Sequence, residues 1–356
     1  AVRKSDRVTI KQVADYAGLS AATVSRVLNG SRPVQEDLKV KVWDAVKKLN
    51  YKPNVGARFM KGQTTNVIGM LVPDVSQPFF SAMIAGAILK AGEIDHVIII
   101  STSDGKRELE KAAIDSLSRT VVDGLIYCPV STGDPLPQIE SFKELPIVVV
   151  GRRNVFKSKP HVYTDNVKGG YLATKYLLRL GRKRVGFLAG FWSSPCTIDT
   201  IGEVASSEDA GKYTTLDRYM GYRRALEEEK IEYDPSLIVI CGYDYEAGYI
   251  GARELLERMV EVDSVIAAND LVAAGVIGFL TDQGINVPDQ VSVVGYDNNL
   301  IAPITIPTLT SVDQDPRTLG AESVVALSKI LSGKEVSDTI IDVKLTIRNS
   351  TSVMRG

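Results

Sequence analysis

The first fifty or so residues have apolar positions that recur every three or four residues, a spacing that predicts short amphipathic helices. Thr9 begins a capping box at the start of the first helix, and Gly18 breaks that helix. Ser20 can cap a second helix, which ends at Asn29, and a third helix runs from about residue 35 to 49. The side chains expected to face inward are Val13, Ala14 and Ala17, then Val24, Val27 and Leu28, then Val42, Trp43, Val46 and Leu49.

Beyond residue 66 the pattern changes to short apolar runs that alternate with helical patterns. The runs are VIGMLVP, VIIIS, GLIYCP, IVVVG, RVGFLAG, LIVIC, SVIAAND and VSVVGYD, and the helical patterns include 107–120, 167–180, 217–229, 244–259 and 270–283. Strands that are buried on both faces and alternate with helices predict a parallel α/β sheet. Eight or more such units exceed a comfortable single sheet, so we predict two lobes.

The first two predicted helices are joined by a short turn that contains glycine, which is typical of a helix-turn-helix. In that motif the N-terminal residues of the second helix contact base edges in the major groove of DNA. Ala21 and Ala22 offer methyl contacts, for example to thymine, and Arg26 can pair with guanine through two hydrogen bonds. Phosphates can be held by Ser20, Thr23, Ser25 and Asn29. The alternative interpretation is a small helical bundle that contacts protein.

Charge favours the DNA interpretation. Residues 1–62 hold 13 Lys and Arg against 5 Asp and Glu, a net charge of +8, whereas the rest of the chain has 29 against 38, a net charge of −9. A basic head on an acidic body predicts that the head contacts a polyanion and that the body has another task.

Composition excludes several classes of protein. The N-terminal AVRKSDRVTI has no apolar core, and no run approaches the ~20 apolar residues of a membrane span, so we expect neither secretion nor a membrane partner. Three widely spaced cysteines suit the reducing cytoplasm. Two distant histidines and the absence of CxxC and HExxH give no basis for a zinc site or a histidine-based triad. No GxGxxG follows a strand and no GxxxxGK[ST] occurs, so we expect no enzyme and no cofactor.

Polar residues that follow the apolar runs are the candidates for ligand binding, because ligands of open α/β sheets bind at the carboxyl ends of the strands. These residues are Asp74, Asn269, Asp270 and Asp297. Asn269 and Asp297 can bind sugar hydroxyls, and each could instead cap the following helix.

The segments TIKQVADYAGLSAATVSRVLNGS and NYKPNVGARFMKG resemble, without gaps, the headpiece and hinge of the lactose-repressor/galactose-repressor family. The resemblance implies an N-terminal all-α helix-turn-helix headpiece and an α/β core of two lobes, like a periplasmic binding protein, with two doubly wound parallel sheets. The expected parts are a headpiece at 1–52, a hinge helix and linker at 53–65 and a core at 66–356. Crossings near residues 165, 296 and 331 would give a first lobe of about 66–165 and 297–330, and a second of about 166–296 and 331–356.

The resemblance makes NVGARFMKG a hinge helix that folds when two copies pair over the minor groove of DNA. Met60 occupies the position of an apolar wedge, and such wedges kink DNA. Gly56 departs from the β-branched or larger apolar residue that relatives usually carry, so we expect the free hinge to be less helical. The DNA contacts expected in all are Thr9, Ser20, Ala21, Ala22, Thr23, Ser25, Arg26, Asn29, Tyr51, Asn54, Ala57, Met60 and Lys61.

The resemblance also implies a site for a small-molecule effector between the lobes. Its expected residues are Asp74, Phe79, Phe80, Arg218, Tyr243, Asn269, Asp297 and Gln314. The chain departs from the family at 191–217, a longer segment that could be a flap over the pocket, an alternative contact or a loop. It also has Gly151, Arg152 and Arg153 where many relatives keep an acidic residue. The added positive charge favours either an acidic or phosphorylated effector or a surface salt bridge.

These observations predict a transcriptional regulator that represses a carbohydrate-utilisation operon. It would bind a pseudo-palindromic operator in double-stranded DNA under control of a sugar or sugar derivative. We expect a homodimer, because a helix-turn-helix that reads a palindrome works as a two-fold dimer and TIRNSTSVMRG has no heptad repeat. The alternative is a solute-binding or enzymatic α/β protein with an accessory DNA-binding head.

Overall fold

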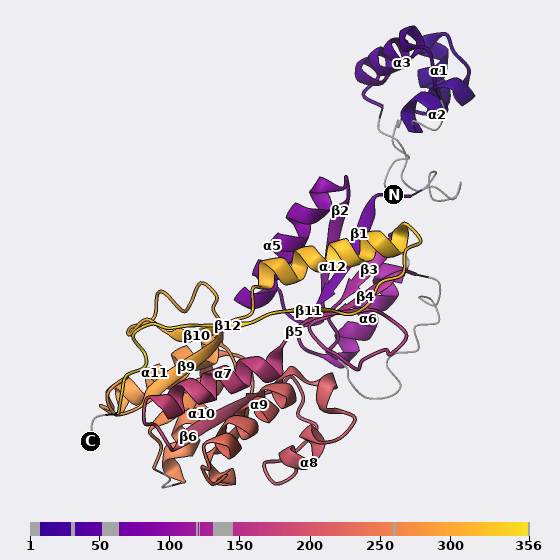
Figure 1. The fold of residues 1–356 in the computed structure, drawn as a ribbon. Coiled ribbons are helices and arrows are strands. Elements are labelled where there is room, and N and C mark those ends of the chain that lie inside the picture. Colours follow the sequence, from indigo (N-terminus) through magenta and orange to yellow (C-terminus); the bar gives the residue numbers. More distant parts are fainter. Residues whose placement is uncertain are drawn as a thin grey trace. The chain divides into compact units, whose positions relative to one another are not determined.

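A computed structural model describes residues 8–29, 33–51, 64–118, 120, 122–130, 145–258 and 261–354. The chain divides into two compact units, Ala1–Thr65 and Asn66–Gly356 (Figure 1). The predicted hinge contacts Asn54, Ala57, Met60 and Lys61, together with Gly56, lie outside the described residues.

The first unit contains helices α1 (Ile10–Ala17), α2 (Ala21–Asn29) and α3 (Glu36–Lys48). The predicted capping box is present, since the Gln12 amide donates to Thr9 Oγ1 at 3.3 Å and Gln12 Oε1 accepts from the Thr9 amide at 2.7 Å. Gly18 ends α1 with a φ of 65°. The buried core of this unit is Val13, Ala14, Val24, Val27, Val42 and Ala45. The prediction that Trp43 belongs to this core is wrong, because α3 turns Val42 and Ala45 inward and leaves Trp43 53% exposed.

The described residues of the second unit form two sheets, each of six strands (Figure 1). The first has the order β11-β5-β4-β3-β1-β2, and its strands are all parallel. Their bounds are β1 Val67–Val72, β2 Val97–Thr102, β3 Gly124–Tyr127, β4 Ile147–Val150, β5 His161–Thr164 and β11 Thr339–Ile341. Ile68, Met70 and Val72 of β1 pack on one face of this sheet with α5 (Pro78–Glu93) and α12 (Pro316–Leu331), and Leu71 packs on the other with α6 (Arg107–Ser118).

The second sheet has the order β12-β10-β9-β8-β6-β7. Its strands are β6 Val185–Gly190, β7 Ile238–Cys241, β8 Ser264–Ile266, β9 Ser292–Asp297, β10 Thr310–Asp313 and β12 Lys344–Thr346, of which only β12 is antiparallel to its neighbour. The helices of this lobe are α7 Asn166–Arg179, α8 Ile201–Ala205, α9 Thr214–Glu228, α10 Tyr245–Glu257 and α11 Asp270–Asp282, with short 3-10 turns at Ala210–Lys212 and Pro235–Leu237. The eight apolar runs therefore all form strands, and β5, β10, β11 and β12 were not predicted.

Two of the predicted crossings between the lobes are wrong. The first crossing lies at Asp165, between β5 and α7, as expected. The second lies at 314–315 and not near 296, because β10 follows β9 in the same sheet. The third lies at 342–343 and not near 331, because the chain returns through β11 to the first sheet before it reaches β12. The first lobe therefore comprises about 66–164 and 316–341, and the second about 166–313 and 344–354.

Pairs of facing glycines bring helices into close contact in both lobes. A Cβ on Gly86 of α5 would lie 2.1 Å from the Arg317 carbonyl oxygen, and one on Gly320 of α12 would lie 1.9 Å from that of Met83. The same kind of close contact between glycines and facing backbone joins α7 to α9 through Gly170 and Gly221, and α10 to α11 through Gly248 and Gly275. Figure 1 shows α12 beside α5, so the glycine contact ties a late segment of the chain to the first lobe.

We expect Gly86→Ala to lower the free energy of unfolding by about 3 kcal/mol, because backbone cannot move aside as a flexible side chain can. Gly92→Ala is the matched control, since Gly92 lies in the same helix and its Cβ would meet nothing within 4 Å. That change should raise stability by up to ~1 kcal/mol, the difference in helix propensity. Urea unfolding followed by circular dichroism measures both, and equal effects would contradict the close-packing interpretation.

Candidate functional site

The first unit exposes the helix face that is expected to contact DNA. Ala21 and Ala22 begin α2 and are exposed, and Arg26 is exposed one turn later. Ser20 Oγ accepts a hydrogen bond from the Thr23 amide at 3.1 Å and so caps α2, and it lies 2.9 Å from Thr23 Oγ1. Thr9 similarly caps α1. Ser25 and Tyr51 are half-buried, and the Asn29 side chain lies outside the described residues.

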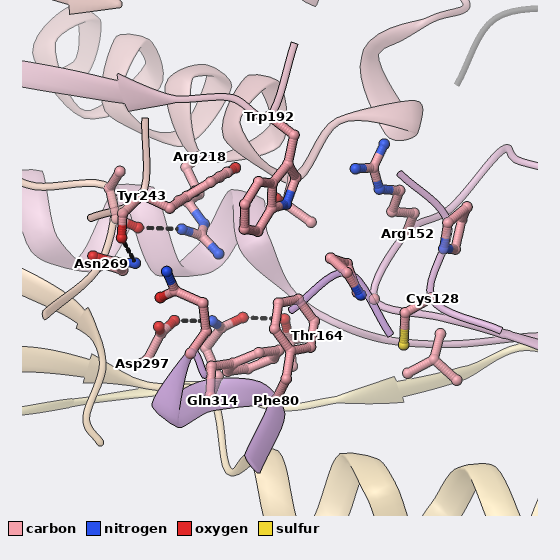
Figure 2. A pocket seen from close by; sticks show the side chains of 18 residues that line it. Phe80, Cys128, Arg152, Thr164, Trp192, Arg218, Tyr243, Asn269, Asp297 and Gln314 are labelled. Carbon is pink, nitrogen blue, oxygen red and sulfur yellow. Dashed lines mark hydrogen bonds between the residues drawn. The ribbon is translucent and has the colours of Figure 1, made fainter. Parts of the chain in front are cut away.

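The second unit has a cavity between its lobes, at the carboxyl ends of the strands of both sheets (Figure 2). The cavity holds about 690 Å³, counting space open to solvent. Residues at or just after successive strands line it: Cys128, Arg152 and Thr164 from the first lobe, and Trp192, Tyr243, Asn269, Asp297 and Gln314 from the second and its crossing.

Seven of the eight predicted effector residues line this cavity, namely Phe79, Phe80, Arg218, Tyr243, Asn269, Asp297 and Gln314. Asp74 does not line it. Its Oδ1 accepts a hydrogen bond from the Ser76 amide at 2.8 Å, so this carboxylate stabilises the turn that leads into α5. The neighbouring Pro73 and Gln77 line the cavity instead.

Arg218 is held rigidly in the cavity wall. It lies in α9 and is 8% exposed. Its Nε donates to Asn166 Oδ1 at 2.8 Å and its Nη1 donates to the Ala268 carbonyl at 2.7 Å. The guanidinium also stacks 3.6 Å from the centre of the Tyr296 ring. Its Nη2 has no acceptor among the described residues, so this nitrogen is available to a ligand oxygen.

Asp297 is the buried carboxylate of the cavity. Its Oδ1 accepts from Gln314 Nε2 at 2.6 Å, and Gln314 Oε1 accepts from Thr164 Oγ1 at 2.6 Å, which joins three cavity residues in one chain (Figure 2). Burial raises the pKa of Asp297 to about 7, although Arg218 and the bond from Gln314 act in the opposite direction. Asp297 has a φ of 101°, a conformation that non-glycine residues adopt at a cost.

Asn269 caps the following helix and also lines the cavity. Its Oδ1 accepts from the Val272 amide at 2.8 Å and so caps α11, while its Nδ2 donates to the Tyr243 carbonyl at 2.9 Å and the residue lines the cavity. The next residue, Asp270, is buried behind the site and accepts from the Asn299 amide and Ser311 Oγ. Burial and then the charge of Asp297 raise the pKa of Asp270.

Trp192 is a cavity residue that sequence reasoning missed. Its ring lies 5.2 Å from that of Tyr243, measured between centroids. A Cβ on Gly105 of the first lobe would lie 2.2 Å from Trp192 Cε3, so the indole packs against the opposite lobe. Trp192 stands just after an apolar run, which is the position that identified Asn269 and Asp297.

The segment 191–217 belongs to the second lobe and forms hydrogen bonds with the residues that follow β4 in the first lobe. Arg153 forms a double hydrogen bond with Asp217, with Nη2–Oδ1 at 2.5 Å and Nε–Oδ2 at 3.0 Å. The Arg153 amide donates to the Gly211 carbonyl at 3.0 Å, and Arg152 Nη1 donates to the Lys212 carbonyl at 2.8 Å. One arginine of the GRR sequence therefore forms a salt bridge between the lobes, and the other lines the cavity.

Within the part of the chain that the structure describes, no helix has the length and apolar character needed to cross a membrane. In the same residues no group of three or more His, Cys, Asp and Glu side chains gathers in a way that could hold a metal ion.

Comparison with known proteins extends over nearly the whole chain. Residues 9–54 match the family of bacterial regulatory proteins called lacI, and residues 65–349 match periplasmic binding proteins and the sugar binding domain of the LacI family. The chain is 36% identical to the HTH-type transcriptional regulator RegA of Clostridium saccharobutylicum over 345 residues, which are 96% of this chain and 99% of that protein.

Solved structures give the same result. The crystal structure of the lac repressor dimer bound to operator and the anti-inducer ONPF is 25% identical, with a TM-score of 0.80 over 98% of this chain and 100% of that one. The complex of the transcriptional regulator CelR with cellobiose is 29% identical, with a TM-score of 0.70 over 97% of this chain and 100% of that one.

Asp297 should make stability depend on pH. Because its pKa is raised from an unfolded value of about 3.9 to about 7, the folded state binds this proton more tightly than the unfolded state. The resulting stabilisation is fully present below about pH 4 and is lost as pH rises through 7. We expect Asp297→Asn to abolish this loss of stability at high pH. In the absence of ligand near pH 8, the variant should therefore melt at a higher temperature than the parent protein. Thermal unfolding between about pH 5 and 8 measures it. The exposed Asp289→Asn is the control, and parallel pH profiles for the parent protein and Asp297→Asn would contradict the expectation.

Proposed function

Because the chain belongs to the LacI family of bacterial regulatory proteins, and is a DNA-binding transcriptional regulator with an effector-binding core, we propose that it represses a carbohydrate-utilisation operon. In this proposal it acts in the cytoplasm as a homodimer, and a sugar or sugar derivative between the lobes controls its affinity for operator DNA. The chain is a regulator and not an enzyme, like the relatives it matches.

The cavity between the lobes is the observation that carries the effector part of the proposal. Arg218, Asn269, Asp297 and Gln314 place charged and amide groups around one end of it, where sugar hydroxyls can donate and accept hydrogen bonds. The aromatic side chains of Phe80, Trp192 and Tyr243 also line it and offer apolar faces to the ring of a sugar. The similar CelR structure is a complex with cellobiose, which supports a carbohydrate for this cavity.

Control of DNA binding would follow from the position of the cavity, which both lobes line. A ligand that contacts both lobes binds one arrangement of them better than another, and only such a difference can shift the equilibrium between the two. The Arg153–Asp217 pair and the Thr164–Gln314 bond hold the described arrangement, so the ligand acts against or together with these contacts.

Sequence-specific DNA binding is tested by selecting operator sequences from random duplex DNA with the full chain. We expect Arg26→Ala to lower affinity for the selected sequence by about 1–3 kcal/mol and to relax the preference at one base pair, because a bidentate contact to guanine is lost. Lys48→Ala is the control, since this exposed lysine of α3 pairs with Asp44. Failure to select any sequence would contradict the regulator proposal, and an unchanged preference in Arg26→Ala would contradict the role of Arg26.

An apolar surface of the first lobe supports the homodimer. Strand β2 is at the edge of its sheet and exposes Val97, Ile99 and Ile100, and α5 exposes Ile88 and Leu89. Val97 and Leu89 are each 65% exposed. An edge strand with large exposed apolar side chains favours pairing with another chain, and a two-fold dimer would cover this surface in both copies.

We expect the double variant Leu89→Asp, Val97→Asp to be monomeric in analytical ultracentrifugation, because two carboxylates would be buried without partners in the interface. It should also lose affinity for a palindromic operator while each headpiece stays folded. Leu109→Asp is the matched control, since Leu109 is exposed on α6, on the other face of the sheet. A double variant that sediments as a dimer would show that the interface lies elsewhere.

A further inference from the structure

Arg152 brings a positive charge to the cavity. It follows β4, lines the cavity together with Trp192 and Tyr243, and lies with its guanidinium 5.8 Å from the centre of the Tyr213 ring. Nη1 donates to the Lys212 carbonyl at 2.8 Å. No acceptor among the described residues bonds to Nε or Nη2. Figure 2 shows Arg152 at the opposite end of the drawn residues from Asp297, with Trp192 between Arg152 and Arg218.

Two other cations near this end of the cavity, within the described residues, are already paired with carboxylates. Arg153 pairs with Asp217, and Lys212 Nζ lies 2.6 Å from Asp209 Oδ1. The carboxylate whose charge acts on Arg152 is that of Glu110, but its Oε1 accepts from the Tyr127 hydroxyl at 2.9 Å and from the Val130 amide at 2.6 Å. In the described part of the chain no carboxylate forms an ion pair with Arg152. Burial correspondingly lowers the pKa of Arg152.

We propose that the effector is a sugar acid, that Arg152 binds its carboxylate, and that the hydroxyl groups of the same molecule bind at Asp297, Asn269 and Arg218. This inference rests on the proposed role of the cavity as the effector site. It identifies the chemical class of the ligand and assigns its specificity to a residue outside the predicted effector set.

The arrangement of donors on Arg152 favours a carboxylate over a neutral sugar or a phosphate ester. With Nη1 engaged, Nε and Nη2 remain as the pair of donors that matches the two oxygens of a planar carboxylate. A neutral sugar would leave these donors without water and without a charged acceptor when the cavity closes, which is costly for a buried charge. A phosphate ester carries up to two negative charges, and the adjacent cations Arg153 and Lys212 are already neutralised.

Isothermal titration of the full chain compares acids with their neutral parents: D-galacturonate with D-galactose, D-gluconate with D-glucose, and D-glucose 6-phosphate as the phosphate arm. We expect at least one sugar acid to bind about tenfold to a hundredfold more tightly than its neutral parent, the contribution of a charge-assisted pair of hydrogen bonds. The same acid should change the affinity for the selected operator sequence, and its neutral parent at equal concentration should not.

Variants separate a binding role for Arg152 from a structural one. Arg152→Gln should abolish the preference for the acid, so that the acid and its neutral parent bind with equal affinity. Arg152→Lys, which keeps the charge but lacks the planar pair of donors, should retain part of the preference. Arg179→Gln is the charge-matched control, because Arg179 is exposed at the end of α7 and should bind the acid as the parent protein does.

Each contrary outcome overturns the inference. It is wrong if no sugar acid of the set binds, if neutral sugars bind as tightly as the acids, or if the phosphate ester binds more tightly than both. It is also wrong if Arg152→Gln weakens acid and neutral sugar equally, which is the result expected of a residue that only supports the Lys212 backbone. All of these results leave operator selection intact, whereas loss of operator selection itself counts against the proposed function. The comparison of acids with neutral sugars on the parent protein needs no variant to fold.

Discussion

Three segments cross between the two lobes of the core, and contacts between these segments hold the lobes together. The Asp165 amide donates to the Ile341 carbonyl at 3.1 Å, Thr164 Oγ1 donates to Gln314 Oε1 at 2.6 Å, and Lys168 pairs with Asp342. Two of the crossings also begin helices, because Asp165 caps α7 and Asp315 caps α12. These contacts between the crossing segments stabilise the described arrangement of the two sheets, and the cavity lies beside them.

The same crossings connect the cavity to the segments that join the two lobes. Gln314 accepts from Thr164 on one side and donates to Asp297 on the other, so a ligand that bonds to Asp297 acts on a residue of a crossing. Positive φ angles occur at Asp297, which bonds to Gln314, and at Asp315, which follows Gln314 in the chain. The backbone at both residues is held in a conformation of higher energy. Local strain of this kind persists only where surrounding contacts determine it, and here those contacts belong to the site.

The sequence predicts most where local rules suffice. The capping box at Thr9 and the glycine at Gly18 are local signals, and the structure has both. The eight buried strands are continuous apolar runs, so their burial is visible in the residues themselves. Strand β10 reads TSVD, and its polar side chains are buried because Ser311 bonds to Asp270 and Thr310 lies 2.9 Å from Thr351. Such pairing joins residues about forty positions apart, which explains why β10 and the second crossing were misplaced.

The errors at the site have a similar cause. Asp74 and Trp192 both follow strands. The Asp74 carboxylate accepts a hydrogen bond within its own turn, whereas the Trp192 indole lines the cavity, and this difference depends on tertiary packing. Arg152 and Arg153 are neighbours in sequence but differ in their partners. Arg153 pairs with Asp217 of α9, in the other lobe, whereas Arg152 lines the cavity. The charge of a residue is readable in sequence, whereas the presence of a counter-ion depends on the fold.

The position of Trp192 allows intrinsic fluorescence to distinguish the two units of this molecule. The chain has two tryptophans, and they divide between its two units: Trp43 is exposed on the headpiece, and Trp192 stacks near Tyr243 and packs against Gly105 of the opposite lobe. Indole emission depends on the polarity of its surroundings, so separation of the lobes and binding of DNA affect different fluorophores. A protein that keeps only one of the two tryptophans would report on one of these two equilibria through its intrinsic fluorescence.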